Sequence, residues 1–170
     1  IVIGHIGRLT EQKNSVFLID IFNEIVKKNS NARLILVGDG NLKKQVLKRI
    51  SSYGISDYVI YLGRTEKIYE LPSLYEGLPV VGIEAQCTGL PVFFSDAVPK
   101  ESSPCDDLGF FISLKNNAEE WADIILTNTI ELAKNRRERK AELKRYGFDS
   151  DTEANKLGEY YLELVGKKYV

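Results

Sequence analysis

Two glutamates, Glu76 and Glu84, are separated by seven residues, and the sequence between them changes from a loop pattern to a helix pattern. Gly77 directly follows the first glutamate. Pro79 stands where a helix would begin, because the N–H that proline lacks is one that the first turn of a helix does not use. The apolar residues that follow run to Gly89, a typical helix end. The sequence therefore predicts a loop that leads into a buried helix of about three turns.

The start of such a helix is a natural seat for phosphate, because its first N–H groups lack partners and face the positive end of the helix dipole. A carboxylate inside an otherwise apolar helix is costly unless a polar group meets it. Hydroxyl groups of a sugar or ribose would meet the carboxylate of Glu84. The alternative is a carboxylate that reaches solvent or a nearby lysine, which we would favour for a lone glutamate on an unknown helix.

The sequence around the first glutamate, Pro-Ser-Leu-Tyr-Glu-Gly-Leu-Pro at 72–79, resembles a signature of retaining GT-B glycosyltransferases. The resemblance is to family 4 of the nucleotide-sugar transferases, and most to the bacterial exopolysaccharide and capsule type. The spacing of the glutamates alone would be a weak signal, but the flanking residues make it specific. The resemblance covers nearly the whole chain except the stretch around Glu70. It implies the C-terminal, donor-binding half of a GT-B fold.

The resemblance also implies roles for the residues of this stretch. Glu76 would lie against the donor sugar as a catalytic residue. Backbone N–H groups at Gly77, Leu78 and onward would hold the distal phosphate, with Pro79 as the helix starter. Glu84 would accept hydrogen bonds from the ribose hydroxyls.

A second constellation, Gly7-Arg8 with Lys13, follows the first apolar run of the chain. Doubly wound folds bind ligands beyond the carboxyl ends of their strands, and two cations there can neutralise a diphosphate. The family has a comparable Gly-Arg…Lys stretch whose cations contact the donor diphosphate. By resemblance, Arg8 and Lys13 therefore take a donor-binding and catalytic role beside Gly7. Two solvated surface cations are the alternative.

Two weaker signals follow later strands. The turn Gly38-Asp39-Gly40 needs no ligand, but the family often has a similar turn near the donor, so Gly38 is a candidate. The strand end at 62–64 matches the place where family members hold the nucleotide base, which makes Arg64 a candidate contact.

These residues need a scaffold, and the hydrophobic pattern predicts one. Apolar runs alternate with helical patterns, which predicts right-handed βαβ units and an α/β fold with a doubly wound, Rossmann-like parallel sheet. Residues 1–150 are expected to form the nucleotide-sugar-binding domain, and residues 151–170 a helix that packs on it or toward a missing N-terminal domain. The expected strands are 1–7, 33–37, 59–62, 91–95 and 109–112, and the expected helices begin at Ser15, Lys43, Pro79, Asn117 and Asp151 or Thr152.

One part of the pattern does not fit. Residues 66–71 are too few for a parallel crossover of about ten or more residues. Either a central strand is lost or residues are missing here, and we favour missing residues. The chain also has no methionine and opens on an apolar strand, so we expect a fragment, the second half of something larger.

The composition bounds the class of protein. A chain of 170 residues with a net charge of −1 suits a single domain without a global attraction to nucleic acid. No apolar run approaches the roughly 18–20 residues that span a bilayer, and no signal peptide is visible. Cys87 and Cys105 are expected to be free thiols in a reducing compartment, which predicts a cytoplasmic protein, with the inner face of the membrane left open.

Other signals favour structural roles. Asp149-Ser150-Asp151 is expected to cap a helix rather than bind a metal. The basic run at 134–145 has interleaved glutamates and predicts a solvated helix face. His5 is expected in the first strand, with its nearness to Arg8 leaving a further role open. The chain has no Gly-x-Gly-x-x-Gly, Walker loop or Cys/His cluster, and one histidine gives little support to a hydrolase triad.

The predicted function is transfer of a glycosyl group with retention, from a UDP-sugar to a saccharide or lipid-linked acceptor held by an N-terminal domain. We expect no metal and no other cofactor, no nucleic-acid partner, and leave peripheral membrane association of the full-length protein open. The alternatives are a non-catalytic nucleotide-binding module or another GT-B enzyme, such as a UDP-sugar epimerase.

Overall fold

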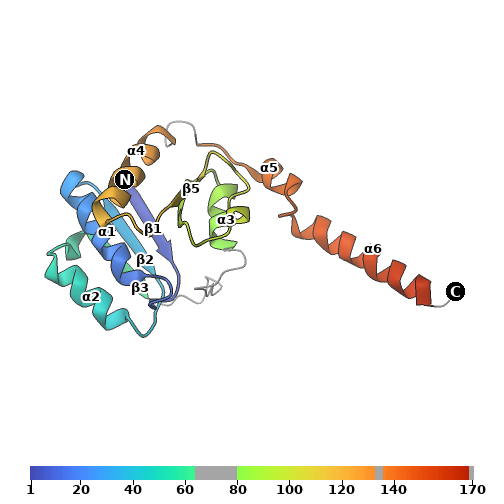
Figure 1. Ribbon diagram of the computed structural model, residues 1–170, viewed down its shortest axis with the longest axis horizontal. Coiled ribbons are helices and arrows are strands. Elements are labelled where there is room, and N and C mark those ends of the chain that lie inside the picture. Colours follow the sequence, from blue (N-terminus) through green and yellow to red (C-terminus); the bar gives the residue numbers. More distant parts are fainter. Residues whose placement is uncertain (64–79, 133–135, 169–170) are drawn as a thin grey trace.

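The computed structural model describes residues 1–63, 80–132 and 136–168 (Figure 1). The first three strands, β1 (Val2–Ile6), β2 (Arg33–Val37) and β3 (Val59–Gly63), form a parallel sheet in the order β1-β2-β3. A second parallel sheet pairs β4 (Val92–Ser95) with β5 (Gly109–Ile112). All five strands consist mainly of apolar residues, as buried parallel strands usually do, although β1 contains His5 and β2 begins with Arg33. The predicted α/β, doubly wound architecture is confirmed, with strand bounds within one or two residues of those expected.

Three helices make the core with the first sheet. These are α1 (Ser15–Lys28), α2 (Lys43–Ser52) and α4 (Ala118–Leu132). Helix α1 lies between the other two and buries Phe22 and Ile25. It meets α4 through the edge-on contact of Phe17 with Trp121, whose ring centroids are 6.2 Å apart. On the described part of the sheet's other face, three large apolar strand residues are exposed: Val2, Ile60 and Leu62.

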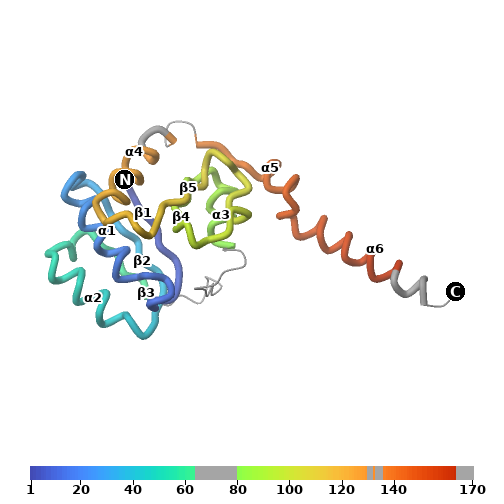
Figure 2. The backbone as a smooth tube through the Cα atoms, viewed as in Figure 1, coloured from blue at the N-terminus to red at the C-terminus, as the bar shows by residue number. Residues whose placement is uncertain are grey.

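Helix α3 (Val80–Cys87) packs beside the second sheet, against β4, the short 3-10 helix η2 (Lys100–Ser102) and α5 (Lys140–Arg145) (Figure 2). Gly82 makes this packing close, because a Cβ there would stand 2.7 Å from the ring of Phe94. Another 3-10 turn, η1 (Ser56–Tyr58), leads into β3.

Helices α4 and α6 begin at side-chain caps. The amide oxygen of Asn117 accepts the N–H of Glu120 at 3.0 Å, and the Glu120 carboxylate accepts the N–H of Asn117 at 2.8 Å, which is a capping box at the start of α4. Asp149 accepts the N–H of Thr152 at 2.8 Å at the start of α6 (Ser150–Lys168). The prediction that Asp149 caps a helix is therefore confirmed. Helix α6 runs outward from the rest of the chain (Figure 1).

The predicted end of helix α3 at Gly89 agrees with the structure, because α3 ends at Cys87 and Gly89 follows with φ of 73°. Its expected start at Pro79 lies outside the described residues. Helix α1 begins at Ser15, as expected, and has no side-chain cap at its start. Asn14 adopts a left-handed conformation with φ of 47°, and the hydroxyl of Ser15 turns to the preceding loop instead. The short stretch at 66–71, where we expect missing residues, lies outside the described residues.

Cys87 and Cys105 are free thiols, as predicted. Within residues 1–63, 80–132 and 136–168, none of the helices has both the length and the apolar character needed to cross a bilayer.

Candidate functional site

The loops that follow β1 and β2 meet at one edge of the sheet. The N–H of Gly7 donates to the Val37 carbonyl at 3.0 Å, and the N–H of Gly38 donates to the Gly63 carbonyl at 2.9 Å. Because parallel strands end at the same edge, this is where a doubly wound fold binds its ligand. The structure thus brings four predicted site residues to the carboxyl edge of β1-β2-β3: Gly7, Arg8, Lys13 and Gly38.

The loop at 7–14 is held by a buried side chain, by a backbone bond to the turn after β2 and by the hydroxyl of Ser15. Leu9 is fully buried, and its N–H donates to the Asp39 carbonyl at 3.0 Å. The buried hydroxyl of Ser15 lies 3.4 Å from the Thr10 carbonyl and 3.5 Å from that of Arg8. These contacts fix the backbone on either side of Leu9. The side chain of Arg8 is exposed at the carboxyl edge of the sheet.

A half-buried histidine, His5, lies beside this loop. A Cβ on Gly7 would stand 3.6 Å from Cε of Lys13 and 3.7 Å from Nε2 of His5, so all three residues meet there. Nε2 of His5 is buried and has no hydrogen-bond partner in the described structure. Burial, and to a smaller extent the charge of Lys13, lower the pKa of His5 to about 4. The imidazole is therefore neutral near pH 7, beside a cation of the predicted site.

The turn at 38–40 is shaped by this loop. Gly38 has φ of +136°, and a Cβ on it would collide with the carbonyl group of Gly7. A Cβ on Gly40 would stand 2.8 Å from the backbone nitrogen of Leu9. Both glycines are thus required by close backbone approach, a structural reason that needs no ligand. Contact of Gly38 with a donor stays a prediction.

Two further residues at this edge were missed from the sequence. The hydroxyl of Tyr61 donates to the Gly38 carbonyl at 2.9 Å, and Nζ of Lys43 lies 5.3 Å from the centre of the Tyr61 ring. Lys43 also pairs with Asp39 at 3.2 Å, which raises the pKa of its ammonium group. The available signal was a cation at the first residue of α2, where the helix dipole disfavours positive charge.

Glu84 lies on α3 with its side chain exposed. The expectation of a carboxylate buried in an apolar helix is therefore wrong, because the buried face of α3 consists of Gly82, Ile83 and Gln86. The exposed carboxylate is open to solvent or to a ligand without a desolvation cost. The remaining predicted site residues lie outside the described residues: Arg64, Glu76, Gly77, Leu78 and Pro79.

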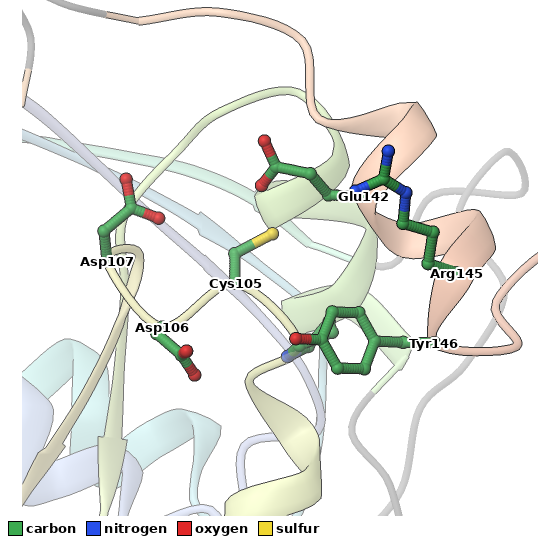
Figure 3. A pocket seen from close by; sticks show the side chains of 7 residues that line it. Cys105, Asp106, Asp107, Glu142, Arg145 and Tyr146 are labelled. Carbon is green, nitrogen blue, oxygen red and sulfur yellow. The ribbon is translucent and has the colours of Figure 1, made fainter.

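A separate hollow of about 390 Å³ lies between α5 and the loop that leads into the amino end of β5 (Figure 3). Its walls include Cys105, whose pKa burial and the nearby Glu142 raise to about 11. Arg139 pairs with both Asp107 and Glu142, so two carboxylates of the hollow already have a cation. In the part of the chain that the structure describes, no cluster of three or more His, Cys, Asp or Glu side chains is arranged to hold a metal ion.

One known family and several known proteins match this chain over most of its length. Residues 1–148 match the family described as glycosyl transferases group 1. The chain is 31% identical over 170 residues to EpsF of Bacillus subtilis (strain 168), which is assigned as a glycosyltransferase. This match covers 95% of the chain and 44% of EpsF. The chain is also 24% identical over 176 residues to an Escherichia coli UDP-Gal:alpha-D-GlcNAc-diphosphoundecaprenol alpha-1,3-galactosyltransferase, covering 96% of the chain and 46% of that protein.

Solved structures show the same fold. HepE of Anabaena in complex with UDP superimposes with a TM-score of 0.71 and 23% identity, over 95% of this chain and 48% of HepE. The C-terminal domain of LpcC, a glycosyl transferase group 1 family protein of Francisella tularensis, has a TM-score of 0.63 and 20% identity, over 87% of this chain and 82% of that domain. The chain thus spans less than half the length of EpsF and HepE, but most of an isolated C-terminal domain.

Proposed function

The chain belongs to the glycosyl transferases group 1 family, and we propose that it binds the nucleotide-sugar donor at the carboxyl edge of β1-β2-β3. The observation that carries the proposal is the locked loop at 7–14. Its backbone is fixed by bonds from Gly7 and Leu9 to the neighbouring loop, and it presents Arg8 and Lys13 where a diphosphate would lie. Cations on a fixed backbone bind an anion without first losing loop entropy.

We propose uridine diphosphate as the nucleotide part of the donor. In support, HepE, which has the same fold, is solved in complex with UDP and with UDP-glucose. Glu84, exposed on α3, would accept hydrogen bonds from the ribose hydroxyls. Arg64, after β3, would contact the base.

The proposed chemistry is transfer with retention at the anomeric carbon. The leaving nucleoside diphosphate gains negative charge as the glycosyl bond breaks. Arg8, Lys13 and the helix start near Gly77 would stabilise that charge in place of a divalent metal. Glu76 would orient the sugar and favour its oxocarbenium-like state. Truncation of one such contact should cost roughly 2–4 kcal/mol of transition-state stabilisation.

The acceptor would be a saccharide or a lipid-linked saccharide, bound by a further domain. The chain spans 44–48% of the relatives EpsF, HepE and the galactosyltransferase, which leaves room for such a domain in a longer protein. Helix α6 exposes Leu157, Tyr160, Tyr161 and Leu162 and would pack on that domain, through which the full-length protein would meet a membrane-bound acceptor.

The first test is calorimetric titration with UDP, GDP and ADP in the presence of a chelator. We expect micromolar to millimolar binding of UDP, weakened by Arg8→Ala and by Glu84→Ala. Binding of another nucleotide would correct the base, and a requirement for a metal would refute the metal-independent site. Failure of every nucleotide to bind the full-length protein would refute the donor site.

A second test separates catalysis from mere nucleotide binding. Glu76→Gln in the full-length protein should lower the transfer rate while UDP still binds. An unchanged rate would remove Glu76 from the catalytic role. NMR of the product should show the anomeric configuration of the donor, and an inverted product would refute retention.

A further inference from the structure

Gln86 is the one fully buried polar residue in the described part of α3, and it lies two residues after Glu84. Its amide nitrogen donates to the Gly82 carbonyl at 3.1 Å and to the Ser102 carbonyl at 2.9 Å. Its amide oxygen accepts the Ser103 hydroxyl at 3.0 Å and the N–H of Cys105 at 3.2 Å. A glutamine side chain can donate two hydrogen bonds and accept two, so every bonding position of Gln86 is filled.

Three of these four bonds join α3 to a segment far along the chain. The loop at 102–105 lies between β4 and β5 and includes the end of η2. The far end of α3 is also tied, because the N–H of Arg139 donates to the Cys87 carbonyl at 2.9 Å. Helix α3 is therefore held by directional bonds as well as by its apolar contact with Phe94.

Directional bonds matter because of where Glu84 lies. Successive residues of a helix are about 100° apart, so Glu84 and Gln86 are on nearly opposite faces. A helix rotation of about 20° would move a carboxylate on the outer surface by roughly 2 Å. A hydroxyl–carboxylate hydrogen bond holds only over about 0.5 Å of donor–acceptor distance. Apolar packing alone permits such a rotation, since it has no direction, whereas the three bonds from Gln86 to the loop at 102–105 oppose it.

We propose that Gln86 is a positioning residue for the donor site, which sets the rotation of α3 and thereby the direction of the Glu84 carboxylate. This inference rests on the proposed function, in which Glu84 binds the ribose. Gln86 itself touches no donor, because its amide is enclosed on the face of α3 that packs against β4 and the loop at 102–105.

The test compares binding of UDP and 2′,3′-dideoxy-UDP to the full-length protein by calorimetry. Wild-type protein should prefer UDP about tenfold or more, since hydrogen bonds to a charged group are the strong ones. Glu84→Gln should reduce that preference. Gln86→Met, which keeps the length of the side chain without its hydrogen bonds, should reduce it to a similar degree. The double variant should lose little more than either single one, because both changes remove the same interaction.

Loss of stability alone must not explain the result. Ile25→Ala is the matched control, because Ile25 is buried in α1 near its end away from the carboxyl edge. It should lower the free energy of unfolding and leave the preference for UDP intact. Should Gln86→Met fail to fold, Ser103→Ala removes the hydroxyl that bonds to the Gln86 amide oxygen and to the Cys105 carbonyl, and should reduce the preference in part.

The outcomes separate the two ideas. Wild-type protein that prefers UDP, together with folded Gln86→Met and Ser103→Ala variants that prefer it equally, would overturn the role of Gln86 and leave the proposed function standing. Wild-type protein that binds both nucleotides equally, or neither, would overturn the ribose role of Glu84 and with it any positioning by Gln86.

Discussion

The carbonyl group of Gly7 occupies the space that a side chain on Gly38 would need. A Cβ there would stand 2.9 Å from the carbonyl carbon of Gly7 and closer still to its oxygen. The loop after β1 and the turn after β2 thus pack backbone against backbone. The hydroxyl of Tyr61 also donates a hydrogen bond to the Gly38 carbonyl. A site on this edge is built from two loops that cannot move independently.

This packing predicts a large effect of Gly38→Ala. Alanine would suffer both the positive φ of 136° and the collision with Gly7, so the free energy of unfolding should fall by at least about 2 kcal/mol. Gly54→Ala is the control, because Gly54 also has a positive φ of 68° but no atom within 4 Å of its Cβ position. That change should cost about 1 kcal/mol. Equal losses in urea denaturation would show that the two loops can separate.

Gly7 should behave in the opposite way. A methyl group there would meet its nearest neighbours at 3.6–3.8 Å, which is ordinary contact, and no positive φ restricts the residue. Gly7→Ala should therefore change the free energy of unfolding by less than about 1 kcal/mol. UDP affinity should nevertheless fall, by about tenfold, if the diphosphate approaches the Gly7 backbone as in other doubly wound folds. Unchanged affinity in a calorimetric titration would place the diphosphate elsewhere.

The strands were predictable because buried parallel strands are short continuous apolar runs. The expected bounds of β2 and β5 agree with the structure residue for residue. The place of Arg8 and Lys13 was predictable for a related reason, since the topology of a parallel sheet carries every strand end to one edge.

What the sequence did not predict depends on contacts between distant segments. Gln86 reads as a polar residue on a helix, and only its bonds to Ser102, Ser103 and Cys105 make it the centre of the packing of α3. Val80 is apolar but 45% exposed. This exposure was not predictable, because the eight residues of α3 offer too little periodicity to identify the buried face of the helix.

His5 should make stability depend on pH. Its pKa in the folded protein is about 4, against an ordinary value of 6.5. As the pH falls, the unfolded chain binds a proton first, so the stability that neutral His5 contributes is complete above pH 6.5 and is lost toward pH 4. Between pH 7 and pH 5 the loss should be about 2 kcal/mol.

His5→Gln tests this assignment, because it removes the titrating group and keeps a polar side chain of similar size. The free energy of unfolding in urea should depend less on pH in the variant, by about the same 2 kcal/mol between pH 7 and pH 5. The carboxylates with lowered pKa, Asp20, Asp96 and Asp149, titrate below this window in both proteins and cancel. Parallel pH profiles would show that folded His5 accepts a proton as readily as the unfolded chain.

The cations of the loop at 7–14 should recognise phosphate rather than the nucleoside. Arg8→Ala and Lys13→Ala should each weaken UDP binding by about tenfold or more, the usual loss for a charge-assisted hydrogen bond. Uridine has no phosphate, so its affinity should change by less than about twofold. Lys48→Ala provides the same loss of charge on an exposed residue of α2, more than a turn beyond Lys43, and should leave UDP binding nearly unchanged.

Ionic strength distinguishes direct contact from a diffuse field. A contact shielded from solvent in the complex keeps most of its effect at 0.5 M salt, where the Debye length is only about 4 Å, whereas a long-range attraction is screened. The ratio of wild-type to Arg8→Ala affinity for UDP should therefore persist at high salt. A ratio that falls to one, or an equal loss of uridine binding, would show that Arg8 acts at a distance or supports the fold of the loop instead of holding the diphosphate.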